Sequence, residues 1–376
     1  MAMHSDLEQI NADAVLHPEL VPEPAQPLTA SNDALITGAT GFLGRYIVAR
    51  LLQKTGRRLF LVVRSKNGQA AANRVTAVLA EIGVHLSDFP DRVTVLEGDV
   101  THDRFGLEAD IYRDCALRID AIYHCSATVD WVRDYGRLRR VNVESVRRMI
   151  HFACTGRKKR IIFSSSIAVC MYSESVGEMT EYTPVLAHVP KMPLGYARSK
   201  AVAETLLAKC AERGVPVTII RPPLISGHSR TGHSNPTDIF AALLQACILT
   251  GKGPDTDWTF DIAPVDFVAK VFTDVPQGAH PWQVLNLKQP NSRHWGNLLT
   301  WINLHGYRVD RVPTQDWIEH SCADGAARGL MLYTQRQYFE GRPPRAGEAG
   351  WVRPFEAYLS ASYSLVRSSK TWTILN

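Results

Sequence analysis

Short hydrophobic runs alternate with longer amphipathic stretches along residues 33–221, and this rhythm predicts alternating strands and helices. The predicted strands are short and apolar, and they cover residues 33–37, 58–64, 92–97, 120–124, 160–164 and 215–221. The predicted helices lie between them, at residues 41–53, 69–82, 135–154 and 196–213. Apolar strands that alternate with helices are typical of an α/β fold with a doubly wound parallel sheet.

This rhythm ends at Pro222 and Pro223, after which Gly, Ser, Asn and Pro residues predict a loop over residues 226–236. Helical patterns then cover residues 236–250, 265–272, 295–304 and 314–322, and residues 284–287 could form one more strand. We therefore predict three parts. Residues 1–31 form a proline-rich linker or extended arm, and residues 32–222 form the sheet domain, with a returning segment at 262–288. Residues 223–376 form a smaller, mostly helical substrate-binding or cap region.

Composition narrows the class of protein without identifying a function. The chain has 376 residues, of which 45% are hydrophobic and 21% are charged, as expected for a folded globular protein. No run approaches the roughly 18 consecutive apolar residues of a membrane span, and the acidic, polar start does not resemble a secretory signal. The seven cysteines lack CxxC spacing, so we expect reduced thiols in a cytoplasmic protein and no metal site. The net charge of +5 says little about partners.

A glycine-rich segment, TGATGFLG at residues 37–44, follows the first predicted strand and opens the first predicted helix. In this context Gly38 permits a tight turn, Gly41 lets the backbone approach a pyrophosphate, and Gly44 permits close packing of the helix. Backbone N–H groups at the start of the helix then face the phosphates. The pattern predicts a Rossmann-type dinucleotide site, although an ordinary glycine-rich turn remains the alternative. The other predicted cofactor contacts in this segment are Thr40, Phe42 and Leu43.

The end of the second predicted strand indicates which dinucleotide binds. An acidic residue at this place would bind the ribose 2′-hydroxyl of NAD. The residue here is Arg64, and no Asp or Glu follows before Glu81. A guanidinium group suits a phosphate, so we predict NADPH, with Arg64 and Arg74 at the 2′-phosphate. On its own, Arg74 is more simply read as a solvated helix residue.

Three further residues indicate the chemistry. Ser166 belongs to a serine run at the end of the fifth predicted strand, at the edge of the sheet where ligands bind in such folds. Tyr196 and Lys200 lie four residues apart on one face of a predicted helix. A tyrosine can give its proton to a carbonyl oxygen while a nicotinamide delivers hydride, and a nearby ammonium would lower its pKa. Each element alone could be fortuitous, but their joint order favours a catalytic site.

Taken together, GATGFLG, FSSSIAV and YARSK resemble an extended short-chain dehydrogenase/reductase. More narrowly, the chain is similar to the thioester reductase domains of nonribosomal peptide and polyketide synthases, and to the terminal domains of carboxylic acid reductases. The segments that carry this resemblance span residues 11–320 and include LVVRS, LEGDVT, IYHCSATVDW, YGRLRRVNVES, RPPLISGHSRTGHSNPTD, FDIAPVDFVAK and WGNLLTWINLHGYRVDRVP. The tail after residue 323 does not match the pattern.

The resemblance implies roles for particular residues. Ser166, Tyr196 and Lys200 would form the catalytic triad, with Tyr196 and Lys200 also contacting the cofactor. The remaining implied cofactor contacts are Asp99 and Val100 beside the adenine, Cys125, Ser126 and Ala127 along the cofactor, and Pro222 and Ile225. Cys125 and Ser126 stand where the family more often has Asn-Gly, so contacts there would be made largely by the backbone.

The resemblance also implies a reaction and a partner. NADPH would reduce an acyl or peptidyl thioester held on the phosphopantetheine arm of a carrier protein, releasing an aldehyde that a second cycle could convert to the alcohol. No carrier motif occurs in the chain, so the carrier would be a separate chain or a neighbouring domain. Carrier proteins are usually acidic, and a basic docking face could be formed by Arg137, Arg139, Arg140, Arg147, Arg148 and residues 157–160. Solvated helix charges are the simpler interpretation.

Three alternatives remain open at this point. A sugar-nucleotide epimerase or dehydratase would use the same scaffold with NAD, which Arg64 and the N-terminal arm disfavour. A fatty acyl-CoA reductase would perform closely related chemistry on a different thioester. A non-enzymatic NADPH sensor is disfavoured because the tyrosine and the lysine are both intact.

Overall fold

The computed structural model describes residues 2–23, 32–130, 133–170, 179–192, 194–235, 238–275, 281–288, 293–314, 316–317 and 320. The tail after residue 323, which departs from the family pattern, lies outside the described residues, as does part of the helix predicted at 314–322. Among the described helices, none has the length and apolar character needed to cross a membrane.

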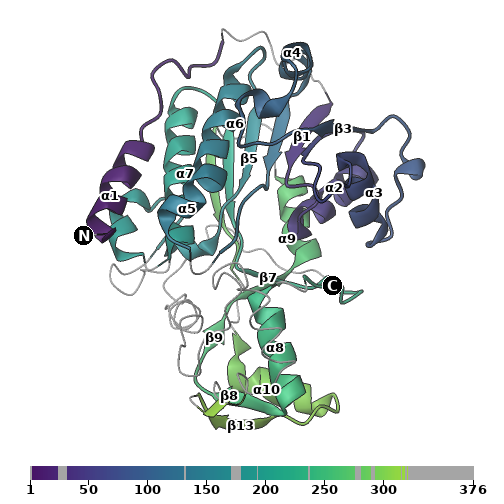
Figure 1. Ribbon diagram of the computed structural model, residues 1–376, viewed down its shortest axis with the longest axis vertical. Helices are drawn as coiled ribbons and strands as arrows, with labels where there is room; N and C mark the ends of the chain where they lie inside the picture. Colours follow the sequence, from purple (N-terminus) through teal and green to yellow (C-terminus); the bar gives the residue numbers. More distant parts are fainter. Residues whose placement is uncertain are drawn as a thin grey trace.

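A seven-stranded parallel sheet forms the centre of the molecule (Figure 1). Its spatial order is β11-β6-β5-β4-β1-β2-β3. The strands are β1 (Asp33–Thr37), β2 (Arg58–Val63), β3 (Val93–Glu97), β4 (Ala121–His124), β5 (Arg160–Ser164), β6 (Val217–Arg221) and β11 (Trp282–Asn286). Leu35 of β1 lies opposite Phe60 of β2 and Ile122 of β4, so the middle strands are in register and their carboxyl ends share one edge. Starting from β1, the chain first adds β2 and β3 on one side and then adds β4, β5, β6 and β11 on the other. Doubly wound sheets bind their ligands at the place where the strand order reverses in this way, which here is beside β1.

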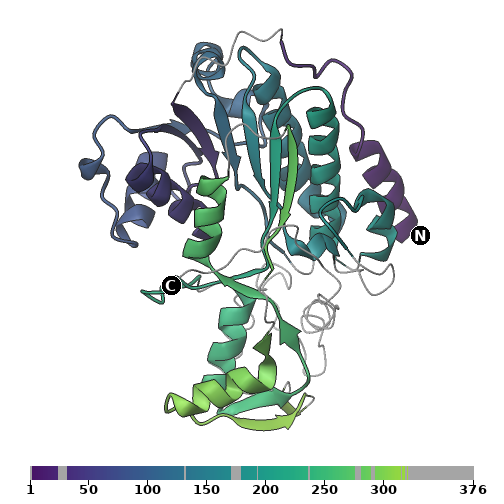
Figure 2. The same ribbon diagram turned by 180° about the vertical axis from the view of Figure 1, so that it is seen from behind.

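Helices cover both faces of the sheet, as the sequence predicted (Figures 1 and 2). Two separate clusters of buried apolar side chains, one on each face, hold these layers together. One face carries α4 (Ala109–Arg118), α5 (Tyr135–Arg139), α6 (Ser145–Cys154) and α7 (Gly195–Glu212); the other carries α2 (Phe42–Lys54), α3 (Ala71–Ala80) and α9 (Val265–Asp274). The sequence did not predict α4, a short helix that buries only Tyr112, Cys115 and Ala116.

The segment at residues 262–288 returns to the sheet domain. It supplies α9, which packs against α2, and the edge strand β11, in which Val284 lies opposite Ile219 of β6. A short parallel pair, β7 (Leu224–Ser226) with β10 (Ile262–Pro264), lies where the chain leaves the sheet domain and where it returns. The sheet domain is therefore discontinuous in sequence.

A smaller lobe hangs below the sheet domain in Figure 1. It contains the helices α8 (Ile239–Thr250) and α10 (Trp295–Leu304) and the strand pairs β8 (Lys252–Asp255) with β13 (Asp310–Pro313) and β9 (Thr259–Phe260) with β12 (Arg293–His294). Trp295 is buried between Trp258 and Phe260, and its indole Nε1 donates to the carbonyl of Pro254 at 2.8 Å. The sequence predicted helices at both places, over residues 236–250 and 295–304. It did not predict the strand pairs, because two- to four-residue strands carry no clear period.

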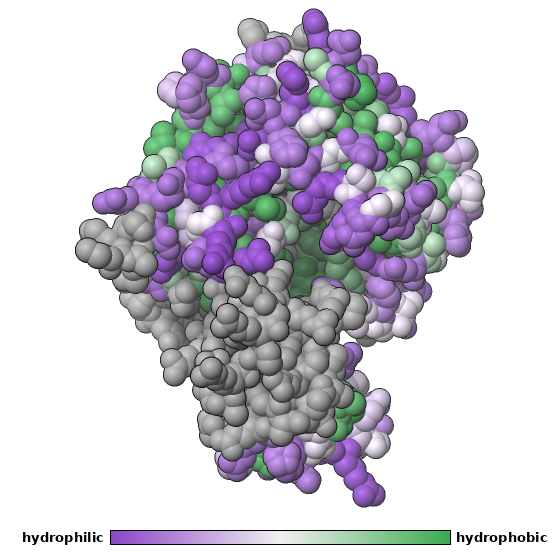
Figure 3. Space-filling view, viewed as in Figure 1, coloured by the Kyte–Doolittle hydropathy of each residue, from purple (hydrophilic) through white to green (hydrophobic). Residues whose placement is uncertain are grey.

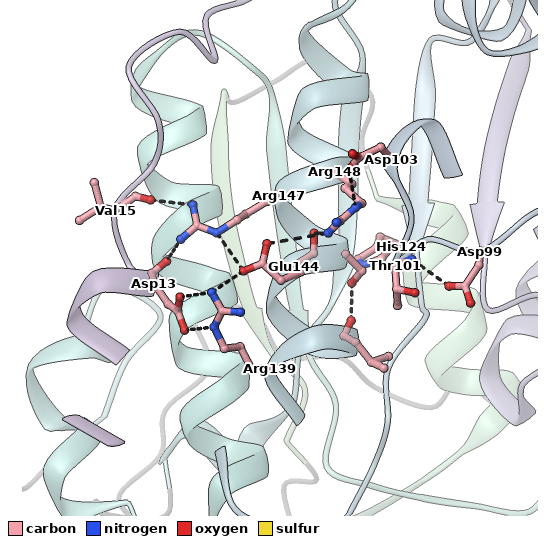
Figure 4. Close-up of polar contacts among 12 residues, drawn as sticks. Asp13, Val15, Asp99, Thr101, Asp103, His124, Arg139, Glu144, Arg147 and Arg148 are labelled. Atoms are coloured by element: carbon pink, nitrogen blue, oxygen red, sulfur yellow. Dashed lines mark hydrogen bonds and ion pairs between the residues drawn. The ribbon is translucent and has the colours of Figure 1, made fainter. Parts of the chain in front are cut away.

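The start of the N-terminal segment is helical, whereas the sequence predicted a linker or an extended arm. Residues Ala2–Asp13 form helix α1, and Ile10, Ala14 and Leu16 are buried against the sheet domain. The Asp13 carboxylate accepts from the Tyr135 hydroxyl at 2.7 Å and from Nη2 of Arg139 at 2.6 Å. Figure 4 shows Asp13 facing Arg139, beside Arg147.

Basic side chains hold the backbone that follows α1. Arg147 donates to the carbonyls of Asp13 and Val15, Lys209 donates to that of Ala14 at 2.8 Å, and Arg213 donates to that of His17 at 2.6 Å (Figure 4 for Arg147). These contacts join residues about 130 to 200 positions apart in the sequence, which is why no local pattern could reveal them.

Candidate active site

The glycine turn between β1 and α2 has the geometry that a bound pyrophosphate requires. Gly38 adopts a φ of +74°, and a Cβ there would lie 2.7 Å from the carbonyl carbon of Cys125. A Cβ on Gly44 would lie 2.0 Å from the carbonyl oxygen of Gly38, so only glycine allows α2 to pack this closely on the turn. Gly41 is the N-cap of α2, whose first N–H groups therefore point toward the carboxyl edge of the sheet.

A cavity of about 260 Å³ opens beside this turn. Ten of the predicted cofactor residues line it: Gly38, Thr40, Gly41, Arg64, Arg74, Asp99, Val100, Cys125, Ser126 and Ala127. The wall thus combines the backbone of the glycine turn with the carboxyl ends of β2, β3 and β4. This dinucleotide cradle is a glycine turn that leaves no room for a Cβ, with arginine side chains at the rim of the cavity. Such a site fits the phosphates of a dinucleotide.

Two arginines and one acid form the rim of this cavity. Arg64 is 63% exposed, and its Nη1 lies 3.6 Å from a carboxylate oxygen of Asp99. Arg74 donates to the carbonyl of Arg64 and, at 3.4 Å, to the hydroxyl of Thr40. Burial alone would raise the pKa of Asp99, but hydrogen bonds from Thr101 and the charge of Arg64 lower it below its usual value. The Arg64 guanidinium is therefore held near the cavity while remaining exposed enough to meet a phosphate.

The other predicted cofactor contacts lie outside the lining of this cavity. Gly44, Phe42 and Leu43 belong to the start of α2, where the Phe42 ring packs edge-on against Tyr46 at 5.8 Å. Pro222 follows β6, and its carbonyl accepts from the backbone N–H of Ile167 at 2.9 Å. Ile225 lies in β7 opposite Ala263. Their roles stay predictions.

Ser166, Tyr196 and Lys200 come together at the carboxyl end of β5. Ser166 follows this strand and shares a hydrogen bond with the hydroxyl of Tyr196 at the start of α7. Lys200 is buried and donates from Nζ to the carbonyl of Ser164 at 2.7 Å. Its ammonium also lies 5.9 Å from the centre of the Tyr196 ring and 4.7 Å from that of Phe163. The constellation predicted from separate motifs is thus a single cluster.

The protonation of this cluster differs in one respect from the sequence-based expectation. Burial raises the pKa of Tyr196, and the hydrogen bond with Ser166 opposes that shift without cancelling it. The Tyr196 pKa is thus raised where a lowering by the Lys200 ammonium was expected, because burial dominates and that ammonium is directed at the Ser164 carbonyl. Burial also lowers the pKa of Lys200 to about 8. Near neutral pH Tyr196 therefore carries its proton, as a proton donor must.

A second buried polar group supports the end of β4 beside the cavity. Nδ1 of His124 lies 2.7 Å from the Thr37 hydroxyl, and its Nε2 lies 3.3 Å from the hydroxyl of Ser145. Burial and the charge of Lys200 lower the pKa of His124 to about 3, so the ring is neutral at physiological pH. This neutral ring connects β1, β4 and α6 without adding a charge to the site.

The predicted helix at 135–154 contains a π-helical turn, Arg140–Glu144, between α5 and α6. Asn142 lies in this turn and is buried. Its amide nitrogen donates to the carbonyl of Thr128 and to the hydroxyl of Ser199, each at 3.0 Å, and its Oδ1 accepts from the N–H of Thr128 at 2.8 Å. Asn142 therefore fastens the loop after β4 to the catalytic helix. Its only sequence signal was an amide within a helix-forming run, where Asn is unfavourable.

The arginines considered as a basic docking face mostly serve internal contacts. Arg139 and Arg147 hold Asp13 and its backbone, and Arg148 pairs with Asp103 at 3.2 Å (Figure 4). Arg137 and Arg140 remain exposed. Figure 3 shows that hydrophilic side chains dominate the described part of this side of the molecule. Three of the arginines considered for a docking face, Arg139, Arg147 and Arg148, are therefore engaged in contacts within the chain.

Comparison with known proteins agrees with this geometry. The profile of a family described as male sterility protein matches residues 36–272, which is more than half of the chain. The chain belongs to the male sterility protein family. Its match extends from β1 to α9 and includes the whole glycine turn and all three clustered residues.

A reductase domain is found among the solved structures that resemble this chain. The crystal structure of the terminal R domain from the myxalamid PKS-NRPS biosynthetic pathway is 30% identical, with a TM-score of 0.79, and the alignment covers 90% of this chain and 88% of that one. The predicted resemblance to synthase reductase domains and the predicted Rossmann-type fold class are thereby confirmed. The chain therefore has the NAD-binding fold of this family.

Two curated relatives are much longer proteins. Isonitrile lipopeptide synthase from Streptomyces coeruleorubidus is 32% identical over 86% of this chain and 22% of its own length. The large subunit of L-2-aminoadipate reductase from Eremothecium gossypii is 29% identical over 78% of this chain and 22% of its own length. The chain thus spans about a fifth of each of these relatives.

Proposed function

We propose that this reductase releases an acyl or peptidyl chain from the phosphopantetheine thioester of a carrier protein, using NADPH and giving an aldehyde. The observation that carries the proposal is the cluster of Ser166, Tyr196 and Lys200 beside a dinucleotide cradle. The similarity to an R domain of a PKS-NRPS pathway supports a carrier-bound thioester as the substrate. That similarity also favours a carrier-bound thioester over a sugar nucleotide.

Each residue of the cluster has a distinct task in this reaction. When bound, the reduced dinucleotide supplies a hydride to the thioester carbonyl carbon. Ser166 and Tyr196 donate hydrogen bonds to the carbonyl oxygen as its negative charge develops, and Tyr196 transfers its proton to that oxygen. Lys200 stabilises the resulting phenolate by its positive charge. The elements that hold these groups, β5 and α7, are parts of the rigid sheet domain.

Collapse of the hemithioacetal completes the release. Its hydroxyl proton returns to the Tyr196 oxygen as the carbon–sulfur bond breaks, and the departing thiolate takes a proton from water. The aldehyde that remains is itself a carbonyl compound suited to the same cluster. A second cycle would therefore yield the primary alcohol.

Arg64 should set the preference for NADPH over NADH. A hydrogen bond to a charged group contributes about 1.5–3 kcal/mol, so Arg64→Ala should reduce the ratio of kcat/KM for NADPH to that for NADH by roughly tenfold or more. The matched control is Arg113→Ala, an exposed arginine on α4 far from the cavity in sequence and in fold. Steady-state kinetics with both dinucleotides measures the ratio. An unchanged ratio in Arg64→Ala would exclude this role.

The proposed function is tested by mass spectrometry of products. A panel of acyl and peptidyl thioesters is loaded on holo carrier protein, and each is incubated with the reductase and NADPH. We expect free aldehyde or alcohol and a regenerated carrier thiol. The same acyl groups are offered as coenzyme A thioesters in parallel. Turnover of the coenzyme A thioesters alone would assign an acyl-CoA reductase instead, and turnover of neither would overturn the proposal.

A further inference from the structure

A buried carboxylate lies on the same face of α7 as the catalytic residues. Tyr196, Lys200 and Glu204 follow one another at four-residue spacing and therefore share one side of the helix. Glu204 is only 4% exposed. Burying a carboxylate is costly unless it is paired and hydrogen-bonded, so its partners show what it is built to hold.

Arg221, from the end of β6, pairs with Glu204 through two hydrogen bonds. Its Nε lies 3.0 Å from Oε1 and its Nη2 lies 2.6 Å from Oε2. Its remaining nitrogen, Nη1, donates to Oδ1 of Asn286 in β11 at 3.2 Å, and the Asn286 backbone N–H donates to Glu181 at 3.2 Å. Such a bidentate pair fixes both side chains in one geometry. It therefore ties α7 to two strands of the sheet.

Ser165 connects this ion pair to the reacting groups. Its hydroxyl donates to Oε1 of Glu204, and its backbone N–H donates to the carbonyl of Ile220 at 2.8 Å. The residue before it, Ser164, supplies the carbonyl that accepts from Lys200, and the residue after it, Ser166, bonds to Tyr196. The middle residue of this three-residue segment is thus anchored to Glu204, while its two neighbours contact the tyrosine and the lysine.

We propose that Glu204, held by Arg221, is a positioning residue for the reduction. It fixes the segment Ser164–Ser166 against α7 and places a negative charge one turn beyond Lys200. The inference rests on the proposed function only for the roles given to Tyr196 and Lys200.

The groups around Lys200 explain why this negative charge matters. From the end of β4, burial lowers the pKa of His124 to about 3 and raises that of Cys125 to about 12, so both are uncharged at neutral pH. Tyr196 is also uncharged, because burial raises its pKa. Burial lowers the pKa of Lys200 to about 8, and the charges of Cys125 and Glu204 oppose that shift. Since the Cys125 thiol is neutral at physiological pH, the negative charge of Glu204 is the one that keeps the Lys200 pKa from falling further.

One cation and one hydroxyl face the Glu204 carboxylate. Arg221 faces it from β6, and Ser165 faces it from the end of β5. Cys170 lies near this pair and near Glu181, and burial raises its pKa to about 11, so it is neutral. Neutralising Glu204 should therefore weaken the hold on Ser165 and let the pKa of Lys200 fall further.

The test compares Glu204→Gln with Glu212→Gln, the same change at an exposed position on the same helix. Protein labelled with ¹⁵N-lysine is titrated by NMR, with the Lys200 Nζ signal assigned by its loss in Lys200→Met. We expect the titration midpoint of Lys200 to move to lower pH in Glu204→Gln alone. We also expect kcat to fall roughly 10- to 100-fold through misplacement of the reacting groups, with the alkaline limb of the kcat profile moved to lower pH.

Ser165→Ala keeps the ion pair of Glu204 with Arg221 and removes only the hydrogen bond that joins Glu204 to the end of β5. This variant replaces Glu204→Gln as the test if Glu204→Gln does not fold. We expect a reduced kcat in this variant with an unchanged Lys200 midpoint. A wild-type kcat in Ser165→Ala, an unmoved Lys200 midpoint in Glu204→Gln, or equal effects in Glu212→Gln would each overturn the inference. A wild-type enzyme that reduces no carrier-bound thioester would overturn the proposed function instead, because the Lys200 titration is read without any substrate.

Discussion

Tyr196→Phe should lower kcat by roughly 10²- to 10⁴-fold, the range found for loss of a positioned general acid. The substitution removes one oxygen and leaves the ring, which is 93% buried, in place. The Ser166 hydroxyl loses its bond to Tyr196 but still accepts from the N–H of Ala168, and the thioester oxygen loses its proton donor. Because the dinucleotide cavity is lined by other residues, its dissociation constant for NADPH should change little. Single-turnover kinetics and fluorescence titration with NADPH measure the two quantities separately.

The matched control is Tyr182→Phe, because Tyr182 is 83% exposed and its loss of a hydroxyl disturbs no buried contact. That variant should retain wild-type turnover. Full turnover in Tyr196→Phe would move the proton donor to another group. Intact NADPH binding by a wild-type protein without turnover on any thioester or aldehyde would revive the NADPH sensor as an alternative.

Much of the sheet domain could be predicted because its signals are local. The strand predicted at 160–164 and the helix predicted at 295–304 agree with β5 and α10 at both ends. A buried parallel strand is a short apolar run, and the turns between such strands carry Gly and Pro. The glycine turn was also recognisable. Gly38 has a positive φ and Gly44 has no room for a Cβ, so glycine is the residue that suits both positions.

What the sequence did not reveal depends on partners that are distant along the chain. Arg221 and Glu204 are 17 residues apart, whereas Arg139 and Asp13 are separated by 126. The π-helical turn at Asn142 is invisible to a 3.6-residue period, because the apolar positions on either side still fit one helix face. The direction of the Tyr196 shift was also missed, since it depends on burial and on the direction in which Lys200 points.

The N-terminal helix supports the second prediction with a large effect. Asp13→Ala should lower the free energy of unfolding by about 3 kcal/mol, because it removes a buried carboxylate that pairs with Arg139 and accepts from the Tyr135 hydroxyl. Asp13 is 2% exposed, and its loss leaves the Tyr135 hydroxyl without this acceptor, whereas Arg139 keeps its contact to Glu144 at 2.8 Å. Urea unfolding followed by circular dichroism measures the difference, with Asp110→Ala, an exposed acid on α4, as the control.

The same contact predicts a dependence of stability on pH. Burial alone would raise the pKa of Asp13, but the bonds from Arg139 and Tyr135 lower it below the ordinary 3.8. A carboxyl whose pKa is depressed by folding stabilises the native state above its unfolded pKa, and this contribution is lost as the pH falls through the folded value. The wild type should therefore lose stability more steeply than Asp13→Asn between about pH 5 and pH 3. If the two proteins instead lose stability in parallel across that range, the Asp13 carboxylate is not what fastens the N-terminal helix to α5.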